Sequence, residues 1–78
     1  MTVKIYTTNH CPYCQMAKEF FKKNNVSYTE INVEDDEAAA EEMIEKSGQM
    51  GVPVIDVDGE IIVGFNRNAI EKALKSKH

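Results

Sequence analysis

The apolar residues of this chain change their spacing at Pro12, and this change predicts a strand followed directly by a helix. Residues 3–8, before Pro12, are mostly β-branched or aromatic, which is typical of a strand. Pro12 suits the first position of a helix, and Asn24 and Asn25 suit its end. We expect one buried helix face, because apolar residues recur with helical spacing at Tyr13, Met16, Ala17, Phe20 and Phe21.

A second strand and a second helix are expected next. The strand lies within residues 26–33, and the acidic run at residues 34–37 precedes the helix. We interpret that run as complementing the positive N-terminus of the helix dipole, in preference to a patch that binds a partner. The helix should end at Gly48, a good C-cap residue. Its expected buried positions are Ala40, Met43 and Ile44.

The C-terminal part of the chain predicts a hairpin and a last helix. Asp58-Gly59 separates β-rich runs at residues 52–57 and 60–63, and this dipeptide is a strong hairpin signal. Asn66 or Asn68 can cap the helix that follows. The apolar positions of this helix are Ile70, Ala73 and Leu74.

The elements follow in the order β-α-β-α-β-β-α, which defines an α/β fold. The first two strands are joined by a helix, so they should be parallel with a right-handed crossover. The last two strands should be antiparallel. We expect one mixed four-stranded sheet with helices on both faces, in a single domain over residues 1–78, because 78 residues are too few for two cores.

Charge and hydropathy exclude several classes of partner. Nine Lys and Arg residues against thirteen Asp and Glu residues give a net charge of −4, whereas nucleic acids and anionic membranes require a basic face. The longest apolar run, residues 61–63, is far shorter than the roughly 18 residues that span a bilayer. Residues 1–6 lack the continuous apolar stretch of a signal peptide. We therefore expect a cytoplasmic protein that binds neither nucleic acid nor membranes.

Cys11 and Cys14 lie where the first strand gives way to the first helix. A disulfide between them closes a very small loop and removes little entropy from the unfolded chain, so it is a poor stabilising cross-link. A cysteine at a helix N-terminus meets the positive end of the dipole and free backbone N–H groups. Both favour the thiolate, so we expect the pKa of Cys11 to lie below the ordinary value of about 8.5.

The two cysteines should have different roles. Cys11, at the mouth of the helix, should be exposed and should attack a substrate disulfide. Cys14, one helical turn further on, should be shielded and should resolve the mixed disulfide, releasing the reduced substrate. A cysteine pair of this kind beside a βαβ pattern is typical of a redox motif.

Other interpretations of the pair stay open. It could be a structural disulfide in a small interaction domain. It could belong to a zinc site, for which only His10 and His78 are available as further nitrogen ligands. The alternative function is an iron–sulfur cluster carrier, in which the cluster is shared across a dimer. A brown colour after purification without oxygen would favour that alternative.

Over essentially its whole length, the chain resembles the glutaredoxins. The resemblance rests on Cys-Pro-Tyr-Cys at residues 11–14, on Val52-Pro53 at the start of the third strand, and on the turn that contains Gly64. It implies a thioredoxin fold and thiol–disulfide exchange. It also implies that Pro53 is cis and faces Cys11, and that the Val52 backbone pairs with an extended substrate. The substrate-binding residues that it implies are Pro12, Tyr13, Val52, Pro53, Gly64, Phe65, Asn66 and Arg67.

Two departures from the family pattern concern glutathione. Typical members carry Lys or Arg shortly before the first cysteine, but residues 6–10 contain no fixed cation, and His10 is positive only when protonated. Typical members also carry an acidic pair after Gly-Gly. Residues 64–68, Gly-Phe-Asn-Arg-Asn, offer no carboxylate there. We therefore expect glutathione to be a poor partner.

The Gly64-Phe65 pair is similar to that of small glutaredoxin-like redoxins. These include proteins that serve ribonucleotide reductase and take electrons from a thioredoxin-reductase-type flavoenzyme. The resemblance therefore implies a dithiol electron carrier that binds no cofactor and receives electrons from glutathione or from such a flavoenzyme. Its expected partners are disulfide-containing proteins, and we expect it to act as a monomer.

Overall fold

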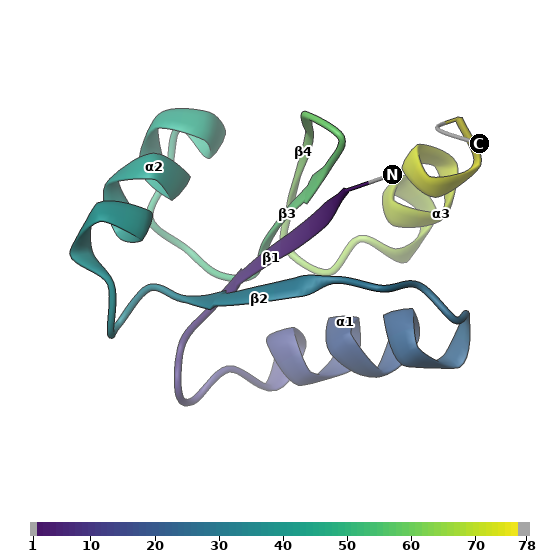
Figure 1. The fold of residues 1–78 in the computed structure, drawn as a ribbon, viewed down its shortest axis with the longest axis horizontal. Helices are drawn as coiled ribbons and strands as arrows, with labels where there is room; N and C mark the ends of the chain where they lie inside the picture. Colours follow the sequence, from purple (N-terminus) through teal and green to yellow (C-terminus); the bar gives the residue numbers. More distant parts are fainter. Residues whose placement is uncertain (1, 77–78) are drawn as a thin grey trace.

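The strands and helices follow the predicted order in the computed structural model, which describes residues 2–76 (Figure 1). His78, considered above as a zinc ligand, lies outside the described residues. The elements are β1 (Val3–Thr7), α1 (Pro12–Lys23), β2 (Thr29–Asn32), α2 (Glu37–Ser47), β3 (Val54–Val57), β4 (Glu60–Val63) and α3 (Arg67–Ser76). Among residues 2–76, no helix has the combination of length and hydrophobicity that crossing a bilayer requires.

The strands form one mixed sheet in the order β2-β1-β3-β4. The helix-linked strands β1 and β2 are parallel, and β3 and β4 form the antiparallel hairpin predicted from Asp58-Gly59. The central contact is an antiparallel pairing of β1 with β3, in which Ile5 lies opposite Ile55 and Tyr6 opposite Val54. The end of β1 therefore lies beside the start of β3.

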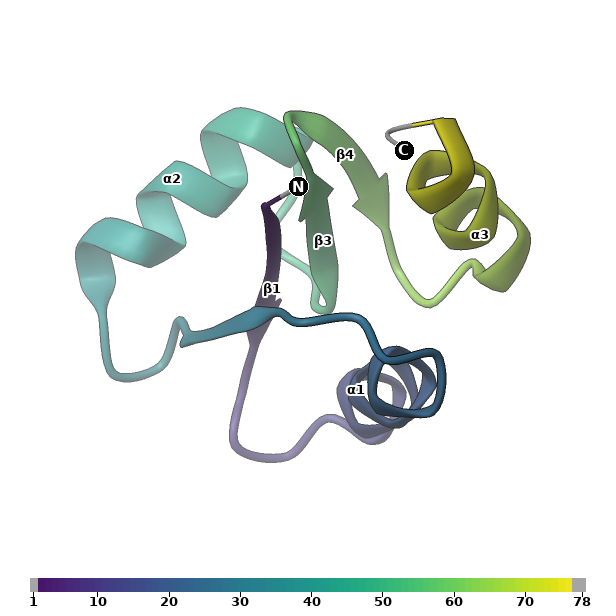
Figure 2. The same ribbon diagram turned by 45° about the vertical axis from the view of Figure 1, so that its right-hand side comes forward.

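Helices cover both faces of the sheet, as predicted. Helices α1 and α3 lie on one side and α2 lies on the other (Figures 1 and 2). The three apolar positions predicted for α3 are all buried. The larger core cluster, under α1 and α3, is centred on Ile5, Phe21, Ile55 and Ile70. The smaller cluster, under α2, consists of Tyr6, Met43 and Val54.

The predicted buried face of α1 is only partly correct. Cys14, Ala17, Phe20 and Phe21 are buried, whereas Tyr13 is 61% exposed and Met16 is 46% exposed. The helix contacts the rest of the fold along a stripe that begins at Cys14. Tyr13 and Met16 lie beside this stripe in the first turns and remain open to solvent.

Of the three positions predicted to be buried on α2, Met43 is confirmed, and Ala40 and Ile44 are wrong. Ala39 and Met43 are buried, but Ala40 is only half-buried and Ile44 is 36% exposed. Within residues 2–76, no other helix shares this face of the sheet (Figure 2). A helix without a lateral neighbour buries only a narrow stripe at spacing i, i+4, so Ile44 lies at its edge.

A polar cluster joins α2 to the centre of the sheet. The Lys46 Nζ lies 2.8 Å from a carboxylate oxygen of Glu42 and 2.9 Å from one of Asp56, and it donates to the Tyr6 hydroxyl at 3.2 Å. Glu42 and Asp56 hold the pKa of Lys46 well above its ordinary value. Burial raises the pKa of Asp56, but hydrogen bonds from Lys46 and from the Gly59 amide outweigh burial, so that pKa is lowered overall.

The substitution Lys46→Met should destabilise the fold by leaving Asp56 without its cation. We expect a loss of about 1–2 kcal/mol in the free energy of unfolding at pH 7, less than for a fully buried pair, because 29% of the Lys46 side chain is exposed. The folded pKa of Asp56 lies below its unfolded value of about 3.9. The stability it contributes is therefore present above that value and is lost as the pH falls below it.

Urea denaturation of both proteins between pH 7 and pH 2.5 measures this effect. The difference in unfolding free energy between parent and variant should shrink as the pH falls below about 4. Lys72→Met, at an exposed position of α3, serves as the control and should change little at any pH. A difference that stays constant down to pH 2.5 would assign the loss to packing instead of to the ion pair.

Candidate active site

Cys11 occupies the N-cap position of α1, directly after the loop that leaves β1. Its backbone is extended, with φ −139° and ψ 96°, and Pro12 is the first residue of the helix, as predicted. The Cys11 Sγ accepts a hydrogen bond from the backbone N–H of Cys14 at 3.1 Å. The sulfur thus takes the place that a Ser or Asp oxygen usually holds at the end of a helix.

The two cysteines are joined as a disulfide, with their Cα atoms 5.2 Å apart. Cys11 is partly exposed, whereas Cys14 is only 1% exposed. An approaching molecule therefore reaches the Cys11 sulfur first. The described residues, 2–76, contain no group of three His, Cys, Asp or Glu side chains placed to hold a metal ion.

A network of polar side chains fixes the loop before Cys11, and the sequence did not reveal it. The Asn9 N–H and its side-chain amide donate to the two carboxylate oxygens of Glu34 at 3.1 and 2.8 Å. Asn32 donates to the Asn9 side-chain oxygen at 2.6 Å. Glu34 belongs to the acidic run that the sequence assigns to the N-terminus of α2. Asp36, which caps that helix, and Glu37, in its first turn, confirm this interpretation for the end of the run, whereas Glu34 binds Asn9 instead. The chain separation of Asn9 and Glu34 leaves no local signal for their contact.

The segment before β3 lies close to the same end of β1. The peptide bond between Val52 and Pro53 is cis, as the glutaredoxin resemblance implies. Pro53 is fully buried, and Val52 is half-buried. Because Val54 pairs with Tyr6 in antiparallel register, Pro53 lies beside the end of β1, where the loop to Cys11 begins. The Pro53 carbonyl accepts from the Gly64 N–H at 2.8 Å, which brings the turn before α3 to this place.

The residues after Gly64 are engaged within the fold. Gly64 has a φ of +78°, a left-handed conformation that glycine adopts without strain. The Asn66 side chain caps α3 by accepting from the Ala69 N–H at 3.1 Å, so Asn66 and not Asn68 is the cap. The Arg67 guanidinium lies 5.5 Å from the Phe20 ring centroid and 3.4 Å from a carboxylate oxygen of Glu71.

The predicted substrate-binding residues therefore fall into two groups. Pro12 and Tyr13 are exposed on the first turn of α1, and Val52, Pro53 and Gly64 meet at the neighbouring end of the sheet. Phe65 and Arg67 lie further along, against the ring of Phe20 in the third turn of α1, and Asn66 between them caps α3.

The disulfide at this junction of a mixed sheet and a helix defines a thioredoxin-fold redox protein, and comparison with known proteins names its family. The family model Glutaredoxin matches residues 3–62. A glutaredoxin-like 8.6 kDa protein in the rubredoxin operon of Clostridium pasteurianum is 48% identical over 73 residues, which are 94% of this chain and 97% of the relative. This chain belongs to the glutaredoxin family.

One further relative and one solved structure are similar to this chain. Glutaredoxin 3 of Escherichia coli is 42% identical over 62 residues, covering 80% of this chain and 75% of the relative. The structure of the glutaredoxin-like protein NrdH-redoxin from Escherichia coli has a TM-score of 0.83 and 28% identity, and covers 92% of this chain and 93% of the other. That structure is described as the basis of a thioredoxin-like activity profile.

The Asn9–Glu34 contact should govern the mobility of the loop that carries Cys11. Glu34→Ala removes the acceptor of the Asn9 N–H, so the exchange of this amide with solvent deuterium should accelerate by about tenfold or more. Amides of α1 beyond its first turn should keep their rates. Exchange followed by NMR measures both. Glu41→Ala, at an exposed position of α2, is the matched control, and equal acceleration in that variant would show that the contact does not hold the loop.

Proposed function

We propose that the protein is a dithiol oxidoreductase that reduces disulfides in other proteins. In this proposal Cys11 attacks and Cys14 resolves. The observation that carries it is the Cys11 sulfur at the N-cap of α1, within hydrogen-bond distance of the Cys14 N–H. The same donor and the helix dipole stabilise negative charge on that sulfur once the disulfide is opened. The partial exposure of Cys11 and the burial of Cys14 support the division of roles.

The reaction starts from the reduced pair. The Cys11 thiolate attacks one sulfur of the substrate disulfide, and the other substrate sulfur leaves as a thiolate and takes a proton from water. The Cys14 thiol then loses its proton, and its thiolate attacks the Cys11 sulfur in the mixed disulfide. The second substrate thiolate is released and protonated, and the protein ends with the Cys11–Cys14 disulfide. Two electrons and two protons from a reductant restore the dithiol.

The site also offers a surface for an extended substrate chain. Val52 precedes the buried Pro53 at the start of β3, and this segment lies beside the end of β1, next to the loop of Cys11. In the proposal, the Val52 backbone pairs with the substrate main chain as a short β-type contact, and Tyr13 packs against it. We further propose that the protein works as a monomer in the cytoplasm, with disulfide-containing proteins as partners.

The Cys14→Ser variant should trap the intermediate, because the resolving thiol is missing. Incubated in reduced form with a protein disulfide, it should accumulate a mixed disulfide through Cys11 that non-reducing electrophoresis and mass spectrometry detect. Cys11→Ser should form no such adduct, and the hydroxyl of the introduced serine keeps the N-cap, so this variant remains a folded control. An adduct through Cys14 in the Cys11→Ser variant would reverse the two roles. If Cys14→Ser turned over as fast as the parent protein, the reaction would follow a monothiol route.

We also propose that a flavoenzyme of the thioredoxin-reductase class, and not glutathione, is the main electron source. Glutathione carries two carboxylates and an ammonium group, and charge-assisted hydrogen bonds to such groups are worth roughly 1.5–3 kcal/mol each. Residues 6–10 supply no fixed cation, Asn66 is occupied as a helix cap, and Arg67 already faces Glu71. Losing two such bonds lowers affinity by on the order of 10²-fold or more.

Steady-state reduction of a small mixed disulfide distinguishes the two electron sources. With NADPH and a thioredoxin-reductase-type enzyme, the rate should reach a plateau as the concentration of this protein is raised. With glutathione and its reductase, the rate should rise almost linearly with glutathione up to the millimolar range. Saturation at micromolar glutathione, with no turnover from the flavoenzyme, would make this a glutathione-dependent glutaredoxin.

A further inference from the structure

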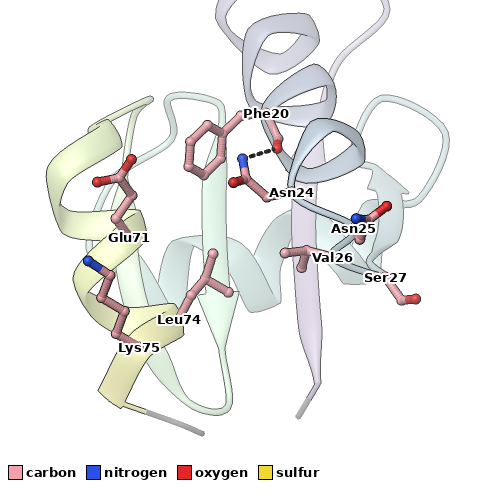
Figure 3. A pocket seen from close by; sticks show the side chains of 8 residues that line it. All are labelled: Phe20, Asn24, Asn25, Val26, Ser27, Glu71, Leu74 and Lys75. Carbon is pink, nitrogen blue, oxygen red and sulfur yellow. Dashed lines mark hydrogen bonds between the residues drawn. The ribbon is translucent and has the colours of Figure 1, made fainter.

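A continuous groove runs between α1 and α3, beside the cysteine site. It consists of two hollows, of about 600 and about 430 Å³, which share Phe20 and Asn24. Figure 3 shows the outer hollow, with Glu71, Leu74 and Lys75 of α3 on one side and Val26, which follows α1, on the other, and with Phe20 of α1 at one end. We call the two hollows together the α1–α3 groove.

The inner end of the groove adjoins the cysteine site. Met16, which lines the inner hollow, lies one helical turn after Pro12 and Tyr13, so it is their neighbour on the surface of α1. Phe65 lines the same hollow and follows Gly64, whose N–H bonds to the Pro53 carbonyl. From Met16 to Asn24 the helix rises by about 12 Å, a length that roughly four extended residues span. A chain leaving the cysteine site therefore has a path of this length along the groove.

The groove is positive on a protein that is negative overall. Its lining holds four of the nine Lys and Arg residues of the chain but only two of its thirteen Asp and Glu residues. Glu71 already faces Arg67, and Lys22 and Lys23 form no ion pair with any residue in the described range 2–76. The remaining lining residues that bear charge are Glu19 and Lys75.

The floor of the groove is apolar. Phe20 and Leu74 reach the surface at their edges, and Phe65 and Met16 are open to a larger extent. The Phe20 ring meets the Phe65 ring edge to face, with centroids 6.2 Å apart, so the two rings pack together in the floor. An apolar floor between cationic rims suits a chain that has both large apolar side chains and carboxylates.

We infer that the α1–α3 groove binds the segment of a substrate protein that flanks the attacked cysteine, and that this segment is acidic and apolar. The inference rests on the proposed function, because the cysteine site holds the disulfide while the groove holds the neighbouring chain. The cations raise the rate at which an acidic segment arrives and disfavour a basic one. The apolar floor retains the segment after the approach.

Three synthetic peptide disulfides test the inference. Each has the same central disulfide with four-residue tails on both sides, which are acidic and apolar, basic and apolar, or composed of Ser and Gly. The reduced protein is mixed with each peptide, the reaction is stopped by alkylation, and mass spectrometry gives the second-order rate constant. At about 20 mM ionic strength the acidic peptide should react about tenfold faster than the basic one, and salt at about 0.5 M should remove most of this ratio. The acidic peptide should then still react faster than the Ser-Gly peptide.

Charge reversal at a single position locates the effect. Lys23→Glu should lower the acidic-to-basic ratio about threefold, whereas Lys72→Glu, which changes the net charge equally but does not line the groove, should leave it unchanged. Circular dichroism verifies that both variants are folded. An equal loss in both variants would assign the preference to net charge, and equal rates for the three peptides with the parent protein would also overturn the inference. Hydroxyethyl disulfide separates this failure from failure of the proposed function: its reduction through Cys11 needs only the cysteine site.

Discussion

The antiparallel pairing of β1 with β3 is the contact on which the rest of the molecule depends. Both strands are covered by helices on the two faces of the sheet, and Ile5, Ile55 and Val54 are fully buried. Because the strands run in opposite directions, the end of one meets the start of the other. This one strand pairing therefore stabilises the core and brings the loop of Cys11 next to Val52 and Pro53, which are distant in sequence.

The fold could be predicted closely because each element has a local signal at its ends. Pro12 and Asn24 delimit α1, and Asp58-Gly59 sets the hairpin, so the order of elements along the chain, the parallel β1–β2 pair and the β3–β4 hairpin could be predicted from short stretches of sequence. The pairing of β1 with β3 was not predicted, because it joins segments that are distant in sequence. The exposure of helix residues that lie beside a buried stripe could not be predicted in the same way. Periodicity alone gives an apolar stripe, but the side of the stripe that meets the sheet depends on how the helix crosses it. Ile44 was therefore misplaced, and so were Tyr13 and Met16.

In the candidate site, too, local features could be predicted and contacts between distant segments could not. The cysteine pair and its place at a helix start could be predicted, because position and chemistry are both written in residues 7–14. The contact of Asn9 with Glu34 and the groove between α1 and α3 could not, because each joins segments that the fold alone brings together. Asn66 is intermediate: the sequence named it as one of two caps, and the hydrogen bond to Ala69 decided between them.

The cap of α1 by sulfur links the conformation of the helix to the chemistry of the cysteine. The Cys14 N–H donates to the Cys11 Sγ, and the Gln15 N–H donates to the Cys11 carbonyl at 3.2 Å. Both the side chain and the backbone of Cys11 are therefore bonded to the first helical turn. Coupling of this kind is reciprocal. In the reduced protein of the proposed function, a solute or substitution that unwinds this turn would remove the donor that faces the sulfur, and negative charge on the sulfur would in turn tighten the turn. The reactivity that we propose for this sulfur would then depend on the whole first turn, including residues that never touch a substrate.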